Sequence, residues 1–492
     1  MKIDNKLLLK NFLYKIVLEI LKIFIPIISV PYIYRIFKPE IMGQIEFSQS
    51  IVGYFFIFAG FGVYTYGLRE ISRVRDNKEQ RDKLFTELFI ISTISSLLVT
   101  VIYLIYIYFK FNYDNLLKNM LLINSINLIS YVFYIEWINE AFENYKFISK
   151  KSMIIKLLNL ICIFIFIKVS DDYFKYLFLI NIFIFINNLV SFIYIRKYIK
   201  FSFNNLEIKK YIFPLFLMIL ISNLNILYTQ LDKITLGFYG QNMKEVAYYG
   251  VAQKFMSLVM VIIMSIIGVM MPRLSYYLGE NKEEEYKYLL NRVFPYIYLL
   301  LFPIFIGMII LSKEIVFFFG GKEYLPAKEV VIIFSLRLLV VTVESLLANQ
   351  VIFLNKKERV IIILYGICGI INLILKLILI KANLLLSTTT ILTTMISEII
   401  LVVLETYYIK KYLKIKLEIF SLKNLKYLIF SIPFFIIKYL LKDLPYSNLL
   451  NMFIIFLLCS SVYFILLFIS KDKCLKDILE KINLKKLLKG KF

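Results

Sequence analysis

Apolar runs of roughly 18 to 25 residues alternate with short polar stretches along the whole chain. An α-helix rises 1.5 Å per residue, so about 20 apolar residues are needed to cross the roughly 30 Å hydrocarbon layer of a bilayer. The pattern therefore predicts an all-α, polytopic membrane protein with about fourteen transmembrane helices. The expected spans are 13–34, 45–66, 84–109, 118–138, 152–168, 176–195, 212–231, 246–271, 293–312, 327–354, 360–380, 386–408, 425–441 and 449–469.

Composition supports this interpretation. The 492 residues are 60% hydrophobic, and the mean hydropathy is +0.77. A soluble protein of this length could not hide so much apolar surface in its core, so the surrounding solvent must be lipid. No polar stretch is long enough to fold as a separate domain outside the membrane, so function must lie in the helices and their turns.

The formal net charge is +24, and its distribution predicts the topology. Lysine and arginine are concentrated in the N-terminus, in the even-numbered turns and in the C-terminal tail, and they are sparse in the other turns. By the positive-inside rule, both termini are expected in the cytoplasm. The same distribution gives no support to nucleic-acid binding. The first residues lack a small-residue cleavage site, so they are expected to be retained.

The expected organisation is two six-helix lobes and an extra helix pair. Sliding residues 43–73 by 204 positions places Gln49 on Gln253 and Arg69 on Arg273, which suggests duplicated halves. The predicted boundaries are 1–200 for the N-terminal lobe, 201–415 for the C-terminal lobe, and 416–492 for the helix pair with a basic cytoplasmic tail. The tail either lies along the anionic membrane surface or serves only as a topology signal.

Several kinds of chemistry lack the residues they need. The chain has no GxxxxGK[ST] phosphate loop and no histidine, and its four cysteines are widely spaced. We therefore expect no enzyme, no cofactor and no metal site.

What remains are polar and ionisable groups inside the spans, each of which is costly in hydrocarbon by about 2.5–3.5 kcal/mol. Polar stripes are predicted on five helices, and Lys254 stands alone on a further one. The stripes are Lys15, Glu19 and Lys22; Ser222, Asn225, Thr229 and Asp232; Arg337 and Glu344; Asn372 and Lys376; and Ser387, Thr390, Thr394, Glu398 and Glu405.

Two interpretations of these stripes stay open. The charged groups line a shared wet cavity, or they lie near helix ends or form buried pairs that fix helix packing. The residues concerned in the second interpretation are Lys15 and Glu19, Arg337 and Glu344, and Asp232 and Lys233. Prolines in or beside spans are expected to kink helices. Pro272 is expected either to do so or to end its helix.

Residues 11–83 resemble the opening of a known family, the polysaccharide transporters of the Wzx-type O-antigen and capsule flippases. The matching features are Pro31 and Arg35, Pro39-Glu40 with Gly43, and the Arg69-Glu70-Ile71 step. Later stretches that look alike are EWINEAFENYKFIS, TQLDKITLGFYG, VAYYGVAQKFMS, MMPRLS and FFGGKEYLPAKEV. At Glu136-Trp137 the family more often has an apolar or aromatic residue before the tryptophan.

The resemblance implies a MATE-like fold that carries a polyprenyl-diphosphate-linked oligosaccharide to the outer leaflet by alternating access. Cationic groups suit the anionic diphosphate, so the substrate-binding candidates are Lys22, Arg35, Arg69, Lys254, Arg337 and Lys376. A coupling ion would need a carboxylate, and the candidates are Asp232, Glu344 and Glu398. Expected partners are the lipid-linked oligosaccharide, membrane lipids and polysaccharide polymerase machinery, and the resemblance implies a location in the inner membrane of a bacterial cell.

Two other functions compete with this one. A MATE-type exporter of small molecules would use the same fold with an acidic site for cationic drugs, whereas this membrane interior is basic. A membrane glycosyltransferase or polymerase would need a large outer loop, and the loops here are short.

Overall fold

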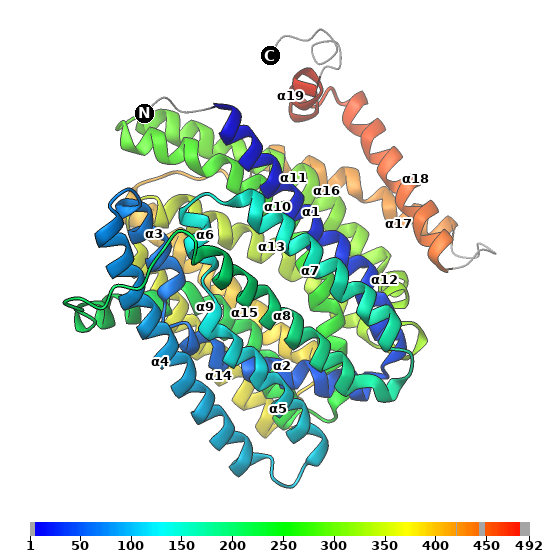
Figure 1. Cartoon of the computed structure of the whole chain (residues 1–492). Coiled ribbons are helices and arrows are strands. Elements are labelled where there is room, and N and C mark those ends of the chain that lie inside the picture. The colour runs from blue at the N-terminus through cyan, green and yellow to red at the C-terminus, as the bar shows by residue number, and fades with distance from the viewer. Residues whose placement is uncertain (1–4, 420, 442–447, 483–492) are drawn as a thin grey trace. The chain divides into compact units, whose positions relative to one another are not determined.

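The structure is a computed structural model that describes residues 5–419, 421–441 and 448–482. All regular secondary structure in these residues is helical (Figure 1). The α-helices are α1 Asn5–Ile36, α2 Pro39–Ala59, α3 Val63–Val74, α4 Lys78–Lys110, α5 Asn115–Ser130, α6 Glu136–Ala141, α7 Tyr145–Phe166, α8 Tyr173–Ile195, α9 Lys209–Tyr239, α10 Met243–Gly279, α11 Glu283–Ile310, α12 Ser312–Gly320, α13 Ala327–Leu346, α14 Glu358–Lys381, α15 Ser387–Tyr408, α16 Leu422–Ser431, α17 Pro433–Leu440, α18 Asn448–Ile469 and α19 Lys473–Ile482. The predicted all-α class is confirmed.

Ten helical segments in the described chain are long and apolar enough to cross a membrane. They are Pro39–Val74, Lys78–Lys110, Asn115–Ala141, Ser170–Ile195, Met243–Gly279, Glu283–Ile310, Ala327–Phe353, Glu358–Lys381, Ser387–Leu413 and Leu449–Ile469. Each overlaps one predicted run. The other four predicted runs fall on α1, α7, α9 and the α16–α17 pair, so the count of fourteen stays a prediction.

Proline and polar residues set several helix boundaries. The predicted run 425–441 is interrupted, and α17 begins at Pro433, where the missing backbone N–H is tolerated because it is a first-turn position. The predicted run 118–138 is also broken: α5 ends at Ser130 and α6 begins at Glu136. By contrast, Pro272 lies inside α10, which continues to Gly279, so this proline does not end its helix.

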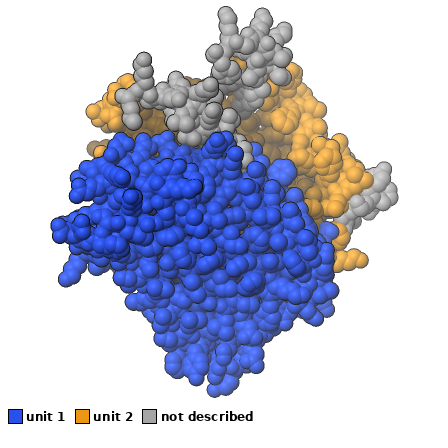
Figure 2. Space-filling view, in the orientation of Figure 1, with its two compact units in different colours: residues 1–250, 379–387 blue, residues 251–378, 388–492 orange. Residues whose placement is uncertain are grey.

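The chain forms two compact units (Figure 2). Unit 1 contains residues 1–250 and 379–387, and unit 2 contains residues 251–378 and 388–492. The boundary between units falls within α10 and at the turn between α14 and α15. The lobes predicted as 1–200 and 201–415 stay a prediction.

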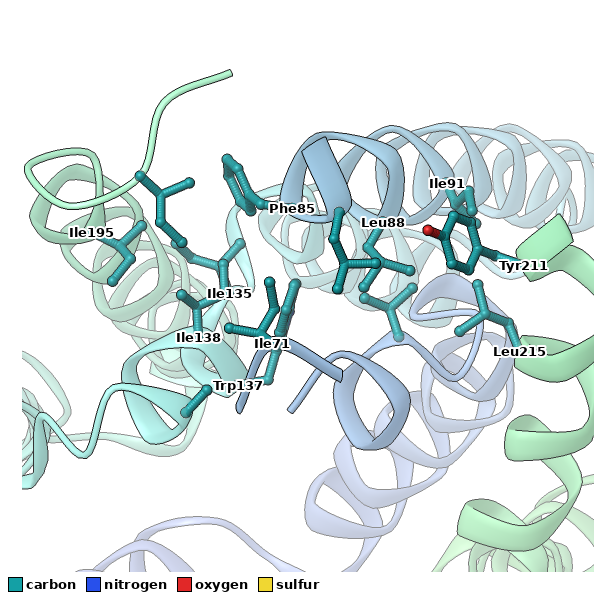
Figure 3. Close-up of a cluster of buried hydrophobic side chains, with 14 residues drawn as sticks. Ile71, Phe85, Leu88, Ile91, Ile135, Trp137, Ile138, Ile195, Tyr211 and Leu215 are labelled. Carbon is teal, nitrogen blue, oxygen red and sulfur yellow. The ribbon is translucent and has the colours of Figure 1, made fainter. Parts of the chain in front are cut away.

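Unit 1 is organised around α2, which packs against α4, α5 and α9. A hydrophobic cluster joins α3, α4 and α6 to the end of α8 and the start of α9 (Figure 3). Trp137 on α6 is 1% exposed and lies against Gly67 on α3. A Cβ atom at Gly67 would come within 2.6 Å of Cε3 of Trp137, so this close approach of the indole ring requires glycine.

Unit 2 has α11 and α13 in its interior. In their most apolar stretches, 61% and 67% of the residues are buried, against 22% for α18. α11 contacts α13, α16 and α17, and α12 contacts α13 and α18. The chain after α13 continues as a π-helix at Leu347–Phe353, where Gln350 donates a hydrogen bond to the carbonyl of Ile267 at 3.1 Å. The interior of unit 2 is thus built on α11 and α13.

Candidate functional site

Unit 1 contains a buried ion pair between α2 and α9. The Nζ of Lys233 lies 2.5 Å from Oε2 of Glu46, and the hydroxyl of Tyr34 donates to Oε1 of Glu46 at 2.8 Å. Glu46 is 2% exposed. Both carboxylate oxygens therefore have partners, which offsets the large cost of placing a charge away from water.

Asp232, a coupling-ion candidate, is the neighbour of Lys233 in the chain and has a partner on another helix. The hydroxyl of Tyr249 on α10 donates to Oδ2 of Asp232 at 2.5 Å, and Asp232 is fully buried. Consecutive residues on a helix point about 100° apart, and these two contact groups on different helices. The pairing of Asp232 with Lys233 stays a prediction.

A second buried ion pair of unit 1 explains the unusual Glu136 beside Trp137. Nζ of Lys151 on α7 donates to Oε2 of Glu136 at 2.9 Å and to the hydroxyl of Ser191 on α8 at 2.5 Å. Ser191 also donates to Glu136. The carboxylate at the start of α6 is thus matched by a lysine, and the group holds three helices together.

Unit 2 contains the predicted residues Arg337 and Glu398 in direct contact. Nε and Nη2 of Arg337 on α13 donate to the two carboxylate oxygens of Glu398 on α15 at 2.8 and 2.6 Å. Arg337 is 5% and Glu398 7% exposed. This is the fork geometry that a guanidinium and a carboxylate favour. The predicted pairing of Arg337 with Glu344 is wrong, because the interhelical partner offers two parallel hydrogen bonds.

Glu344 lies two turns beyond Arg337 on α13 and has different partners. It accepts hydrogen bonds from the hydroxyls of Tyr365 on α14 and Ser345. Nearby on α15, Glu405 is fully buried, and neither of its carboxylate oxygens has a hydrogen-bond partner among the described residues. The two carboxyl groups are close enough to interact electrostatically. They form a buried acidic pair in unit 2.

Sequence reasoning placed Glu405 on the polar stripe of its helix but did not select it as a candidate. Glu405 follows Glu398 by seven residues, which is two helical turns, so the spacing alone made the two equivalent. Only the packing of unit 2 distinguishes them, because Glu398 meets an arginine and Glu405 does not.

Lys376, a substrate-binding candidate, is fully buried on α14. Its Nζ donates to the hydroxyl of Thr394 on α15 at 3.3 Å, and the same hydroxyl lies 3.5 Å from the amide oxygen of Asn372. Residues from two of the predicted polar stripes therefore meet at one place in unit 2. A buried ammonium among hydroxyl and amide groups is a suitable contact for an anion.

The other cationic candidates lie elsewhere. The side chain of Lys22 lies outside the described residues. Arg35 is exposed at the end of α1. Arg69 on α3 is also exposed and pairs with Glu70 at 2.7 Å. Lys254 on α10 is partly buried.

An apolar groove of about 520 Å³ runs between α11, α13, α15 and α16 in unit 2. Leucine, isoleucine, valine and phenylalanine side chains form most of its wall, and Lys410, Ser421 and Asn424 supply polar groups from the region that joins α15 to α16. No sequence motif predicted this groove, because its wall is built from four helices. A groove of this kind suits a hydrocarbon chain rather than a sugar.

Comparison with known proteins links this architecture to membrane transporters. A family model described as polysaccharide biosynthesis protein matches residues 8–278, and one described as MatE matches residues 214–378. A curated relative from Shigella dysenteriae, named "Putative O-antigen transporter", is 24% identical over 357 residues, which is 71% of this chain and 87% of the relative. A protein of the same name from Escherichia coli strain K12 is 26% identical over 34% of this chain and 40% of its own length.

Solved structures show the same fold at low sequence identity. The structure of the lipid II flippase MurJ in an inward closed conformation has a TM-score of 0.67 at 18% identity, and the match covers 93% of this chain and all of that one. An inward-facing multidrug resistance MATE family transporter of the MOP superfamily has a TM-score of 0.59 at 14% identity, with 82% and 96% covered. The predicted MATE-like, multi-pass membrane architecture is thereby confirmed.

Proposed function

The chain belongs to the polysaccharide biosynthesis protein family, and from this premise we propose that it is a flippase for a polyprenyl-diphosphate-linked oligosaccharide. It moves the oligosaccharide from the cytoplasmic to the outer leaflet by alternating access, and it acts as a transporter rather than an enzyme. The relatives named as O-antigen transporters support this assignment. The sugar hydroxyls make such a machine necessary, since each one taken unpaired into hydrocarbon costs several kcal/mol.

The observation that carries the proposal is the apolar groove of unit 2 together with the buried cation Lys376. A polyprenyl chain in the groove keeps the apolar surroundings that it has among the lipid tails. A diphosphate head group needs cationic contacts instead, and Lys376, Lys254 and the more exposed Arg35 and Arg69 are the proposed contacts. Arg337 is a weaker candidate than the sequence indicated, because Glu398 already occupies two donors of its guanidinium.

We propose the acidic pair Glu344 and Glu405 as the group that takes up and releases a coupling ion. Glu398 fits this role less well, because an arginine neutralises it. Asp232 stays a further candidate, since a tyrosine hydroxyl donates to it as Tyr365 does to Glu344. With both termini in the cytoplasm, an inside-negative potential also favours outward movement of the anion by about 2.3 kcal/mol per charge per 100 mV.

The direct test is deletion of the gene, followed by measurement of lipid-linked oligosaccharide in each leaflet. Accumulation on the cytoplasmic face and loss of surface glycan are expected. Lys376→Gln should fail to complement, whereas Lys381→Gln, which removes an exposed charge one turn further along α14, should complement fully. Normal surface glycan in the deletion strain would refute the proposal.

A MATE-type drug exporter is the second candidate, favoured by the MatE family match over residues 214–378. It predicts increased drug sensitivity of the deletion strain with normal surface glycan. The basic character of the membrane interior and the longer match to the polysaccharide family favour the flippase. Contact with a polysaccharide polymerase stays a prediction.

The coupling proposal has a separate test. Glu405→Gln keeps the shape of the side chain but cannot ionise, so transport into vesicles should lose its dependence on a proton or sodium gradient while the protein remains folded. Glu358→Gln, at the partly exposed start of α14, is the matched control. Unchanged gradient dependence in Glu405→Gln would exclude this carboxyl group as the coupling site.

A further inference from the structure

A second cavity of unit 2, of about 530 Å³, lies between α11, α16 and the C-terminal helix α19. Its wall is polar, unlike that of the apolar groove. Tyrosine side chains from α11 and α16 line it together with one face of α19, which is strongly amphipathic in sequence. Nothing in the proposed transport path uses this cavity, so its chemistry calls for a separate explanation.

The charge of this cavity is positive. Four cationic side chains line it, Arg292, Lys426, Lys473 and Lys476, against two lining carboxylates, Asp477 and Glu480, and the adjoining Asp472, which pairs with Lys426. The tyrosine hydroxyls in the wall add further hydrogen-bond donors. A group of lysine and arginine side chains around a concave site is the arrangement that binds phosphate.

Two carboxylates of the C-terminal segment hold the cations in place. Asp477 accepts hydrogen bonds from Nη2 of Arg292 at 2.6 Å and from the hydroxyl of Tyr296 at 2.7 Å. Asp472, just before α19, accepts hydrogen bonds from Lys426 and, at 3.1 Å, from the hydroxyl of Tyr427. Arg292 and Lys426 are therefore held in ion pairs with the C-terminal segment, and Nζ of Lys476 lies 3.8 Å from Oε1 of Glu480. Lys473 also lines the cavity, from α19.

The polar cavity adjoins the apolar groove, because Asn424 on α16 lines both. A molecule that fits the two together has a long hydrocarbon chain on one side of Asn424 and a compact anionic group on the other. A free sugar would leave the groove empty, and a neutral lipid would leave the excess positive charge of the cavity unmatched.

We propose that the cavity binds the diphosphate of the polyprenyl-linked substrate, with the adjoining part of its chain in the groove. The inference rests on the proposed function and adds to it a loading site, at which substrate is captured before its head group enters the transport path. α19 forms one wall of this site, so the C-terminal segment takes part in substrate binding.

The test compares binding of geranylgeranyl diphosphate to purified full-length protein in neutral detergent. The variant is Lys473→Gln/Lys476→Gln, because both lysines are exposed and their replacement leaves the contacts of Asp472 and Asp477 intact. The control is Lys356→Gln/Lys357→Gln, which removes the same charge from an exposed turn of unit 2 that does not line the cavity. Loss of two phosphate contacts should weaken binding about tenfold or more in the variant only.

Competing ligands complete the experiment. Phosphatidylglycerol and geranylgeraniol are expected to compete poorly, because the first carries one phosphate charge and the second carries none. Equal binding to variant and control would overturn the site, and equally strong binding of phosphatidylglycerol would reassign it to bulk membrane lipid and overturn the loading role. Failure of the proposed function is distinguishable, since it would appear as normal surface glycan in the deletion strain whatever this cavity binds.

Discussion

Removing Arg337 should destabilise the protein because it leaves Glu398 buried without its cation. Both side chains are more than nine-tenths buried, and the guanidinium supplies two hydrogen bonds to the carboxylate. Breaking a buried ion pair on one side typically costs 3–5 kcal/mol. For folded units of 150–250 residues, roughly 2–4 °C of melting temperature corresponds to 1 kcal/mol. Arg337→Gln should therefore lower the melting temperature by about 10 °C.

The assay is thermal unfolding of purified protein, followed by the loss of the monodisperse peak on size-exclusion chromatography. The double variant Arg337→Gln/Glu398→Gln is the decisive comparison, because it removes both charges and leaves two amide groups that can hydrogen bond to each other. Its melting temperature should return most of the way to the wild-type value. A wild-type melting temperature in the single variant would refute the reasoning, since it would mean that Glu398 is not held as a dry, charged partner.

The double variant also separates two roles of Arg337. If the arginine serves only to pack α13 against α15, the restored protein should deliver surface glycan normally. If the arginine also contacts the substrate, the double variant should be stable but inactive. Surface glycan measured at matched protein abundance distinguishes these outcomes.

Three further predictions concern packing and pH. Gly67→Val should lower stability by about 1–3 kcal/mol because the new side chain would collide with the ring of Trp137, and Trp137→Leu in the same chain should recover part of the loss in a thermal unfolding assay. Lys151→Met should reduce protein abundance, because it leaves the carboxylate of Glu136 without its cation. Adding Glu136→Gln in the same chain removes the charge and should restore part of the abundance. Burial would raise the pKa of Asp472, but hydrogen bonds from a lysine, a backbone N–H and a tyrosine hydroxyl outweigh it and lower that pKa. This carboxylate therefore stabilises the docking of α19 at pH values above the unfolded pKa of about 3.9, and the stabilisation is lost as the pH falls through the folded pKa. Amide hydrogen exchange in α19, corrected for the pH dependence of the intrinsic exchange rate, should therefore show more frequent opening of the helix at pH 3 than at pH 6.

Much of the fold follows from the length of the apolar runs. A run long enough to cross the bilayer leaves few alternatives to a helix, because lipid offers no hydrogen-bond partner for the backbone. Ten of the predicted runs coincide with membrane-length helices. The break between α16 and α17 was foreseeable only in part, because a proline can either kink a helix or begin a new one, and Pro433 begins one.

The partners of the charged residues could not be predicted in the same way. Helical spacing correctly grouped Arg337 with Glu344 on one helix, but it cannot say which neighbouring helix faces them. The observed partner of Arg337 lies 61 residues further along the chain. Glu136 shows the same limit, because its charge is unexpected beside Trp137 until α7 and α8 supply Lys151 and Ser191. The sequence thus identified which charged residues lie inside the membrane spans. Only the three-dimensional packing shows which of them form ion pairs between helices.

The ion pair between Glu46 and Lys233 has a consequence for how the protein is made. The two residues are 187 positions apart, so the ribosome delivers Glu46 to the membrane several helices before its lysine exists. During that interval Tyr34, only 12 residues away, is already available as a hydrogen-bond donor. Tyr34 can thus donate a hydrogen bond to Glu46 before α9 has been synthesised. Insertion of α9 then supplies Lys233, which completes the ion pair and fixes the packing of α9 against α2.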